Sequence, residues 1–468
     1  MIAELGDNVF TSKDELYSVS YDGLKIKGNP DALIKIYNPE DVGKCLSLAN
    51  EFCVPVTCRG SGSSLTGGAT PFQGGWVLDL SSLDTIEIDK PNRLARCGPG
   101  AVVSNLQEQA SNYGLFYPPD PSSKGFCTIG GNVACNAGGL RCVKYGVTRD
   151  YVLALSGFLP TGEFVQWGRA TRKFATGYNL RDLWIGSEGT LGVVTEITLR
   201  LILATDHRMT FLAAFENDAS AMSAPLELSR LGIQPSILEY MDQWTIDCLQ
   251  KYVGAEVFAG INPRPTLLIE LDGELEVLNR ERDILDTWLK QNSLNHRIAD
   301  NEDDAEELWE VRRQGSSAMK KLANTKLNED IVIPINRQVE LVSFVEDLRQ
   351  EFHLNIGVFG HCGDGNLHVN FMYDEDNENE TERAVSALHL LMEKVVSLGG
   401  AISGEHGVGL AKTPFVQKQF NDAELKAMKA IKEALDPKGI LNPGKIFDVF
   451  KPWTYKKEKV ILSWERHD

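Results

Sequence analysis

A proline- and glycine-rich run at residues 118–139 constrains the fold of this 468-residue chain more than any other segment. It reads Pro-Pro-Asp-Pro-Ser-Ser-Lys-Gly-Phe-Cys-Thr-Ile-Gly-Gly-Asn-Val-Ala-Cys-Asn-Ala-Gly-Gly, with five glycines in its last 15 residues. Proline fixes the backbone angle φ, and glycine lets the backbone approach another group closely. We therefore expect this segment to lie flat against a planar ligand.

A second glycine-rich run, residues 58–71, follows an expected strand at 54–57. Its glycines allow backbone N–H groups to converge on an anion, and its serine hydroxyls add donors. The dinucleotide fingerprint is excluded because Leu65 stands where a third glycine is needed, and the phosphate loop of nucleotide hydrolases is excluded because no lysine is present. Alone, the run is equally typical of a structural turn. Together with residues 118–139 and a third run at 186–196, it favours a nucleotide diphosphate site.

Two of the eight histidines flank a short turn in the segment His361-Cys-Gly-Asp-Gly-Asn-Leu-His368. Asp-Gly is a strong signal for a two-residue hairpin turn. A turn at Asp364-Gly365 places His361 directly opposite His368, with Cβ atoms roughly 5 Å apart. Histidine pairs on hairpins are more often packing residues than ligands, so this pair alone does not predict a metal.

The segment Gly-Glu-His-Gly at residues 404–407 makes metal binding the favoured interpretation of the histidine pair, because Glu405 adds a carboxylate. Two imidazoles and one carboxylate suit zinc, manganese or ferrous iron better than magnesium or calcium. Adjacent side chains point in different directions, so His406 can face a substrate as a base while Glu405 faces the metal. A surface position for His406 is the plainer alternative.

Composition narrows the class of protein. The net charge of −18 argues against nucleic acid or an anionic membrane as a general partner. Nine scattered cysteines with no Cys-x-x-Cys pair suit reduced thiols in a cytoplasmic protein. No run approaches the roughly 18 apolar residues of a spanning helix, and residues 1–23 lack the apolar core of a signal peptide.

The length suggests two or three domains. Residues 31–203 alternate short strands, helices and glycine turns, and we expect the strands at 76–80 and 85–89 to pair with each other. From residue 209 a β-α-β rhythm predicts a second, α+β domain with helices on one face of a sheet.

In its glycine-rich runs the chain resembles flavoproteins of the vanillyl-alcohol oxidase and p-cresol methylhydroxylase type. Within that group it resembles the branch of D-lactate dehydrogenase, D-2-hydroxyglutarate dehydrogenase and the glycolate oxidase catalytic subunit. The resemblance covers nearly the whole chain and implies an α+β fold, with a two-part FAD-binding domain and an α/β substrate (cap) domain. The implied domains are residues 1–205 for FAD, 206–415 for substrate and metal, and 416–468 as a segment returning to the FAD domain.

The same resemblance implies FAD as cofactor, with its pyrophosphate on the 59–64 loop. Several members of the group attach FAD through a histidine of the first domain, but residues 1–206 contain no histidine. We therefore expect non-covalent FAD, with a cysteinyl link through Cys127 or Cys135 left open. The implied cofactor-binding residues are Arg59, Gly60, Ser61, Gly62, Ser63, Ser64, Pro119, Thr128, Gly130, Gly131, Asn136, Gly138, Gly139, Gly189, Gly192, Val194 and Asn442.

The implied reaction is oxidation of a D-2-hydroxy acid to the 2-oxo acid, with His406 as base and hydride passing to flavin N5. His361, His368 and Glu405 would hold the metal, most simply zinc, with manganese or iron as alternatives. The implied substrate-binding residues are Arg312, Ser316 and Asn370. Members that oxidise 2-hydroxyglutarate carry a lysine where Asn328 falls, so lactate or glycolate is favoured, although Lys326 lies near enough to keep a dicarboxylate open.

A separate acceptor must reoxidise the flavin, and an electron-transferring flavoprotein, an iron–sulfur subunit, a quinone or a cytochrome all fit. The chain would be cytoplasmic, or peripheral to a membrane through a partner, and a homodimer is compatible with the sequence. Three other readings stay open: a metal-dependent hydrolase, an oxidase that uses oxygen, and a subunit that docks into an electron-transfer assembly. For docking, the aromatic tail at 453–464 is a candidate contact strand, although packing on its own domain explains it equally.

Overall fold

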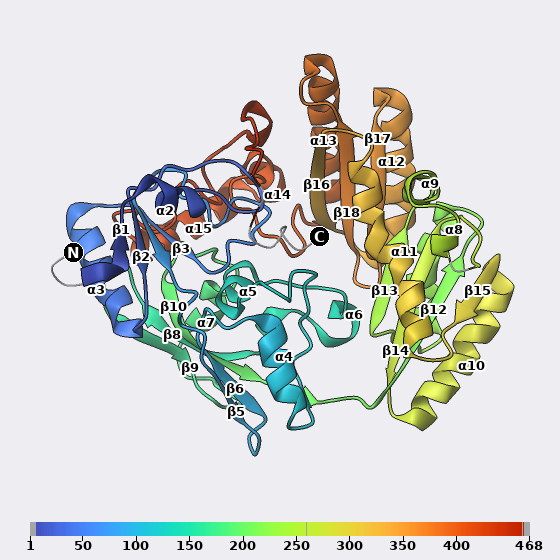
Figure 1. Cartoon of the computed structure of the whole chain (residues 1–468), viewed down its shortest axis with the longest axis horizontal. Helices are drawn as coiled ribbons and strands as arrows, with labels where there is room; N and C mark the ends of the chain where they lie inside the picture. Colours follow the sequence, from blue (N-terminus) through green and yellow to red (C-terminus); the bar gives the residue numbers. More distant parts are fainter. Residues whose placement is uncertain (1–5, 259, 461, 463–468) are drawn as a thin grey trace. The chain divides into compact units, whose positions relative to one another are not determined.

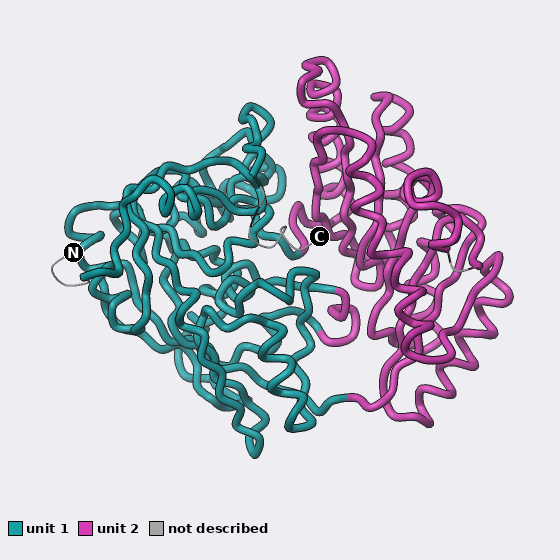
Figure 2. The backbone as a smooth tube through the Cα atoms, viewed as in Figure 1, with its two compact units in different colours: residues 1–139, 146–204, 405–468 teal, residues 140–145, 205–404 magenta. Residues whose placement is uncertain are grey.

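The computed structural model describes residues 6–258, 260–460 and 462. The chain divides into two compact units, which Figure 2 colours separately. Unit 1 contains residues 1–139, 146–204 and 405–468, and unit 2 contains residues 140–145 and 205–404. Residues 405–415, which we expected in the second domain, therefore cluster with unit 1. Of the candidate contact tail, residues 461, 463 and 464 lie outside the described part of the chain.

Unit 1 begins with a four-stranded sheet of order β1-β2-β4-β3, in which β2, β4 and β3 are parallel. Helix α3 (Pro39–Phe52) connects β2 to β3, and its first turn carries acidic side chains, which suit the positive end of a helix. Its buried Val42 and Leu46 pack with Ile34 and Leu78 of the sheet. The C-terminal segment returns to this sheet, because Leu441 forms a bridge with Val56.

The expected pairing of strands 76–80 and 85–89 is wrong. Strand β4 (Trp76–Asp79) lies inside the parallel sheet, whereas β5 (Ile86–Asp89) pairs with β6 in a second sheet. Nearness in sequence suggested a hairpin, but the buried apolar centre of β4 suits an interior parallel strand.

The second sheet of unit 1 is antiparallel, with order β5-β6-β10-β8-β9. Its inner face and helices α4 and α5 share one apolar core that includes Leu106, Val133, Leu155 and Ile197. The strands of unit 1 are β1 (Val9–Phe10), β2 (Ala32–Lys35), β3 (Val56–Arg59), β4 (Trp76–Asp79), β5 (Ile86–Asp89), β6 (Leu94–Cys97), β7 (Leu115–Phe116), β8 (Val152–Phe158), β9 (Phe164–Gly168), β10 (Val193–Arg200) and β11 (Ile202–Leu203). Its further helices are α2 (Lys13–Ser18), α4 (Val103–Ser111), α5 (Ile129–Cys135), α7 (Leu180–Trp184), α14 (Val416–Gln419) and α15 (Asp422–Leu435).

Unit 2 is built on a seven-stranded antiparallel sheet of order β15-β12-β14-β13-β17-β18-β16 (Figure 1). Neighbouring residues of β13 show that helices cover both faces, not one face as expected. The Tyr240 hydroxyl donates to Asp218 of α8, 2.6 Å away, whereas Glu239 accepts from Arg312 of α11. Side chains alternate along a strand, so α8 and α11 lie on opposite faces.

The strands of unit 2 are β12 (His207–Ala214), β13 (Ile237–Met241), β14 (Thr266–Gly273), β15 (Asn295–Ile298), β16 (Thr325–Val332), β17 (Asn355–His361) and β18 (Asn366–Tyr373). The helices are α6 (Cys142–Tyr145), α8 (Asp218–Arg230), α9 (Gln243–Tyr252), α10 (Leu275–Asn292), α11 (Glu302–Lys320), α12 (Gln338–Phe352) and α13 (Glu378–Ser397). Among the described residues of the whole chain, no helix combines the length and the apolar composition needed to cross a bilayer.

Candidate functional site

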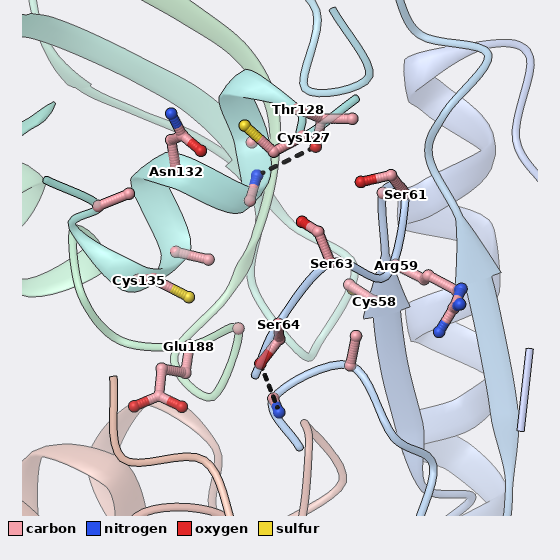
Figure 3. A pocket seen from close by; sticks show the side chains of 18 of the residues that line it. Cys58, Arg59, Ser61, Ser63, Ser64, Cys127, Thr128, Asn132, Cys135 and Glu188 are labelled. Atoms are coloured by element: carbon pink, nitrogen blue, oxygen red, sulfur yellow. Dashed lines mark hydrogen bonds between the residues drawn. The ribbon is translucent and has the colours of Figure 1, made fainter. Parts of the chain in front are cut away.

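Unit 1 contains a cavity of about 340 Å³ formed by its glycine-rich runs (Figure 3). This volume lies within the range of sites for small molecules and cofactors. The residues expected from the sequence that line it are Arg59, Gly60, Ser61, Gly62, Ser63, Ser64, Thr128, Gly130, Gly131, Gly189, Gly192, Val194, Glu405 and His406.

The 60–65 loop lines this cavity and carries a row of backbone donors. Among the described residues, the N–H groups from Gly60 to Leu65 have no hydrogen-bond acceptor. The Ser64 hydroxyl accepts from the N–H groups of Thr66 and Gly68, at 3.3 and 3.1 Å, which fixes the turn that follows. Backbone N–H groups left without partners in a partly buried loop are a ready site for an anion.

Replacing Gly62 with alanine is expected to weaken FAD binding about tenfold or more. Gly62 has a φ of +72°, and an added Cβ would lie 2.1 Å from Nη2 of Arg59. An L-residue in this conformation costs about 1–2 kcal/mol before any clash, and about 1.4 kcal/mol is a factor of ten in affinity. Fluorescence titration of the apoprotein with FAD measures the effect.

Gly114→Ala is the matched control. Gly114 has a similar φ of +68°, but nothing lies within 4 Å of its added Cβ, and it does not line the cavity. Equal FAD affinity in the two variants would exclude the 60–65 loop as the phosphate cradle.

Helix α5 supplies a second wall of the cavity. Thr128 caps its first turn, and the threonine hydroxyl accepts from the Gly131 N–H at 3.3 Å. A Cβ on Gly60 would lie 2.3 Å from that hydroxyl, so the two glycine-rich runs are in close contact. The buried Nδ2 of Asn132 also lines the cavity and has no partner among the described residues. An amide donor in this state fits a ligand with acceptor atoms.

The third run contributes Glu188, which lines the cavity with a left-handed φ of 54°. Its carboxylate accepts from the N–H groups of Val408 and Gly409, both at 2.7 Å, and burial raises its pKa. Its carbonyl accepts from Nδ2 of Asn442, which also donates to Gly68. Glu188 therefore joins the cavity wall to the segment that follows His406.

Glu405 and His406 line the same cavity. The Thr66 hydroxyl donates to the His406 carbonyl at 3.2 Å, which holds this segment against the glycine-rich loop. The two side chains do not point apart as expected, because Nε2 of His406 lies 3.6 Å from Oε1 of Glu405. An imidazole and a carboxylate are thus placed together at the cavity wall.

Five of the expected cofactor residues are not among those lining the cavity. Asn136 ends helix α5, and its side chain accepts from the Arg149 N–H at 2.9 Å. Gly139 has a φ of +149°, and its added Cβ would lie 2.5 Å from the Asp120 carbonyl carbon. Their direct contact with a cofactor stays a prediction, as it does for Pro119, Gly138 and Asn442.

Two cysteines near the cofactor residues were possible attachment points for a flavin. Both Cys127 and Cys135 line the cavity. Burial raises the pKa of Cys127 to about 11 and raises that of Cys135 further above its ordinary value. Because the thiolate is the reactive form, neither side chain is activated for covalent chemistry.

In unit 2, the predicted register of the 361–368 hairpin is wrong. His361 pairs with Asn366, and His368 pairs with Phe359, so the connection is a four-residue loop instead of a two-residue turn. The two-residue shift keeps both histidines on one face, and their ring centroids are 5.3 Å apart. The pair remains close enough to share one metal ion.

A buried carboxylate joins the histidine pair to the predicted substrate arginine. Glu239 has no exposed surface, and its Oε2 lies 2.6 Å from Nε of Arg312. Its Oε1 bonds Nδ1 of His361. Burial raises the pKa of the Glu239 carboxyl, but His361 and Arg312 outweigh burial and lower it to about 2. The carboxylate is therefore ionised, which suits a guanidinium and an imidazole at the same site.

The other predicted substrate residues lie on or beside this face. The Ser316 hydroxyl accepts from Nζ of Lys326 at 2.9 Å, and burial lowers the pKa of Lys326 to about 7. Nδ2 of Asn370 donates to the carbonyls of Gly357 and His368, whereas its buried Oδ1 has no acceptor role among the described residues. Arg313, the next residue after Arg312, is paired with Glu306 and Glu310 of its own helix.

Asp330 fixes the chain immediately before Glu405. This buried carboxylate lies opposite His368 in the β16–β18 ladder. It accepts from the Ser403 hydroxyl at 3.1 Å and from the Gly404 N–H at 3.0 Å. These bonds hold Gly404 beside Asp330. Glu405 is the next residue, so its Cα lies about 3.8 Å from that of Gly404.

Sequence reasoning missed Asn132, Glu188, Glu239 and Asp330. Asn132 and Glu188 stand inside glycine-rich runs that we did identify. Membership of these runs is the sequence feature that could have indicated a position at the cavity. Glu239 is an acidic residue in the apolar strand Ile237–Met241, where a charge requires a partner.

Lys445 is a buried cation of unit 1 whose effect on stability can be measured. It is only 4% exposed, and its ammonium group donates to the Thr70 carbonyl at 2.8 Å. Burial lowers its pKa to about 8, against the opposing effect of Asp22 and Glu188. In the unfolded chain a lysine titrates near 10.4, so between pH 8 and about 10.4 the unfolded state binds more protons. The contribution of Lys445 to the free energy of unfolding should therefore rise over this window.

Urea unfolding of wild type and Lys445→Met at pH 7.5 and 10 measures this contribution. The variant should gain stability relative to wild type at the lower pH and lose that advantage at the higher pH. A difference between the two proteins that is independent of pH would contradict the lowered pKa.

Comparison with known proteins identifies the class of this fold and cavity. Residues 30–168 match the model of an FAD binding domain, and residues 204–446 match that of the C-terminal domain of FAD linked oxidases. Glycolate oxidase subunit GlcD of Bacillus subtilis is 38% identical over 431 residues, which are 92% of this chain and 91% of that protein. D-lactate dehydrogenase of Anaerostipes hadrus is 35% identical, over 90% of each chain.

Among solved structures, p-cresol methylhydroxylase with bound substrate matches with a TM-score of 0.78, covering 96% of this chain and 95% of that one at 17% identity. The expected two-domain fold of this type is confirmed. The match to an FAD binding domain makes the chain a flavoprotein. The chain belongs to the FAD-linked oxidase family, and FAD is its cofactor.

Proposed function

We propose that this protein oxidises a D-2-hydroxy acid to the 2-oxo acid, using FAD and a divalent metal, and passes the electrons to a separate acceptor. The names of the glycolate oxidase and D-lactate dehydrogenase relatives support the substrate class. The observation that carries the proposal is Glu239, which holds both His361 and Arg312. Glu239 thus holds a proposed metal ligand and the proposed carboxylate-binding arginine near each other. This arrangement suits a substrate with a hydroxyl beside a carboxylate.

The residues present fit both groups. The unpartnered N–H groups of residues 60–65 and the free amide of Asn132 suit the pyrophosphate and other acceptor atoms of FAD. For the metal, two imidazoles on one sheet face supply the nitrogen donors that zinc, manganese or ferrous iron prefer. Glu405 is the proposed third ligand, one residue past the Gly404 anchor.

The chemistry follows from these roles. FAD supplies the acceptor for the two electrons and the hydrogen that leave the substrate Cα. His361, His368 and Glu405 would hold a divalent metal, which would act as a Lewis acid and lower the pKa of the substrate hydroxyl. Arg312 binds the substrate carboxylate with its planar guanidinium, assisted by Ser316 and Asn370, and fixes which face of Cα is presented. His406 takes the hydroxyl proton on its imidazole.

The size of the substrate is the finer question. Asn328 in place of lysine favours a monoacid such as lactate or glycolate. A dicarboxylate of the 2-hydroxyglutarate kind is the second candidate, because Lys326 is held against Ser316 and beside the Phe359 ring, 5.4 Å from its centroid. The acceptor is proposed to be a partner subunit, because the Bacillus subtilis relative is named as one subunit of glycolate oxidase.

Anaerobic spectral titration tests the proposal. The FAD-loaded protein is mixed with D- and L-lactate, glycolate and D-2-hydroxyglutarate, and bleaching of the flavin band is recorded. Rapid bleaching by D-lactate or glycolate, and slow bleaching by the L-acid, is expected. Oxidised flavin that persists with every acid would refute hydroxy-acid oxidation.

The flavin is expected to be dissociable. Residues 1–206 contain no histidine, and burial raises the pKa of Cys127 and of Cys135, so neither kind of attachment considered from the sequence has an activated side chain in this domain. Acid precipitation should leave the yellow colour in the supernatant. A flavin that stays with the precipitated polypeptide would show a covalent bond.

A further inference from the structure

We infer that Glu239 is a positioning residue that sets the ligand nitrogen of His361 and the orientation of Arg312 at once. This inference rests on the proposed function, because it gives Glu239 a role toward the metal and toward the substrate carboxylate. It adds a residue that the sequence pattern did not single out.

The geometry of the three residues is specific. Glu239 of β13 is the direct ladder partner of His361 of β17, so the two side chains leave the sheet on the same face. Helix α11 places Arg312 over that face, with its guanidinium carbon 4.4 Å from the centroid of the Phe359 ring. Glu239 has no exposed surface, and each of its two carboxylate oxygens serves one partner.

The contact with His361 decides which nitrogen can bind a metal. A carboxylate oxygen of Glu239 lies within hydrogen-bond distance of Nδ1 of His361 and acts as the acceptor, so Nδ1 carries the proton. The neutral ring then has its lone pair on Nε2, which becomes the ligand atom. Outer partners of this kind fix ring orientation in metal sites, and their loss typically weakens metal binding 10- to 100-fold.

The contact with Arg312 decides how that side chain meets a carboxylate. Glu239 accepts a hydrogen bond from Nε of Arg312. Within the described part of the chain, Nη1 and Nη2 of Arg312 donate no hydrogen bond. These two groups can bind a substrate carboxylate, while the Phe359 ring and Glu239 hold the plane of the guanidinium. One buried carboxylate therefore determines the relative placement of metal and substrate.

Glu239→Gln tests both contacts with almost no change in volume. A glutamine has one acceptor oxygen and one amide donor, so it cannot accept from both partners. If the oxygen stays with Arg312, the amide donates to Nδ1 and forces the proton onto Nε2, which blocks ligation. We expect a 10- to 100-fold weaker affinity for zinc or manganese, measured by chelator competition, together with a higher KM for the hydroxy acid and retained FAD.

Asp242→Asn is the matched control. Asp242 directly follows β13, is 1% exposed and pairs with Arg349, but it contacts neither histidine of the pair. It should keep wild-type metal affinity and KM, although both variants lose a buried charge pair and some thermal stability. Glu239→Asp keeps the charge but is too short to hold both partners, and it should recover only part of either loss.

The outcomes separate this inference from the proposed function. If wild type binds no metal ion tightly, the proposed function fails. If wild type binds the ion and Glu239→Gln binds it equally well with unchanged KM, the positioning role is overturned while the proposed function stands. An equal loss of metal affinity in Asp242→Asn would assign the effect to general destabilisation and would also overturn it.

Discussion

Replacing His406 with alanine is expected to lower the rate of flavin reduction by about 10² to 10⁴. The proposed role of this imidazole is to take the hydroxyl proton, and without a base the substrate alcohol is a poor hydride donor. FAD should stay bound, because the Thr66 contact uses the His406 carbonyl and Glu188 holds the backbone of Val408 and Gly409. Anaerobic stopped-flow measurement of flavin bleaching under single-turnover conditions gives the rate.

The control for this experiment is His207→Ala, because His207 is an exposed residue at the start of β12. It should reduce its flavin at the wild-type rate. Wild-type bleaching in the His406 variant would remove His406 from the role of base, and loss of FAD from it would instead indicate that the side chain supports the cofactor.

Removing the divalent metal is expected to abolish reduction of the flavin by the hydroxy acid. Without a Lewis acid the substrate hydroxyl keeps its high pKa, and His406 is too weak a base to remove its proton. Treatment with a strong chelator followed by desalting should leave the FAD absorbance intact. Zinc or manganese should then restore bleaching, whereas magnesium should not, because imidazoles are poor ligands for it.

Two observations sharpen the chelation experiment. His361→Ala should be purified without stoichiometric metal, as determined by elemental analysis, and added zinc should not restore it. Full flavin reduction in protein shown to contain no divalent metal would exclude metal dependence, and the reaction would then need another means of lowering the hydroxyl pKa.

The sequence predicted the parts of the site in which glycine or histidine carries the signal. The 59–64 loop, Thr128 and the 130–131 glycines were expected from the glycine-rich runs and the family resemblance they carry, and these residues do line the cavity. The shared face of His361 and His368 was predicted although the register was not, because a shift of two residues preserves the face. The pairing of β4 depended on a distant strand, β3, and local pattern carries no such information.

The missed residues are those whose role depends on contacts across the fold. Glu239 is one acidic residue among 65 acidic residues in this chain, and only β13, β17 and α11 together show that it faces His361 and Arg312. The role of Glu188 likewise depends on the hydrogen bonds it accepts from Val408 and Gly409, about 220 residues away along the chain. Long-range pairing of this kind cannot be read from residue type and spacing.

The bridge between Val56 and Leu441, with the contacts of Asn442 to Gly68 and Glu188, has a consequence for synthesis on the ribosome. All of residues 205–404 are translated before Asn442, so unit 2 can finish folding while unit 1 still waits for its last segment. The nascent first half must therefore remain incomplete for the time it takes to add more than two hundred residues, at about 5–20 residues per second. Arrested translation products ending just before Leu441 should accordingly be protease-sensitive in unit 1 and resistant in unit 2.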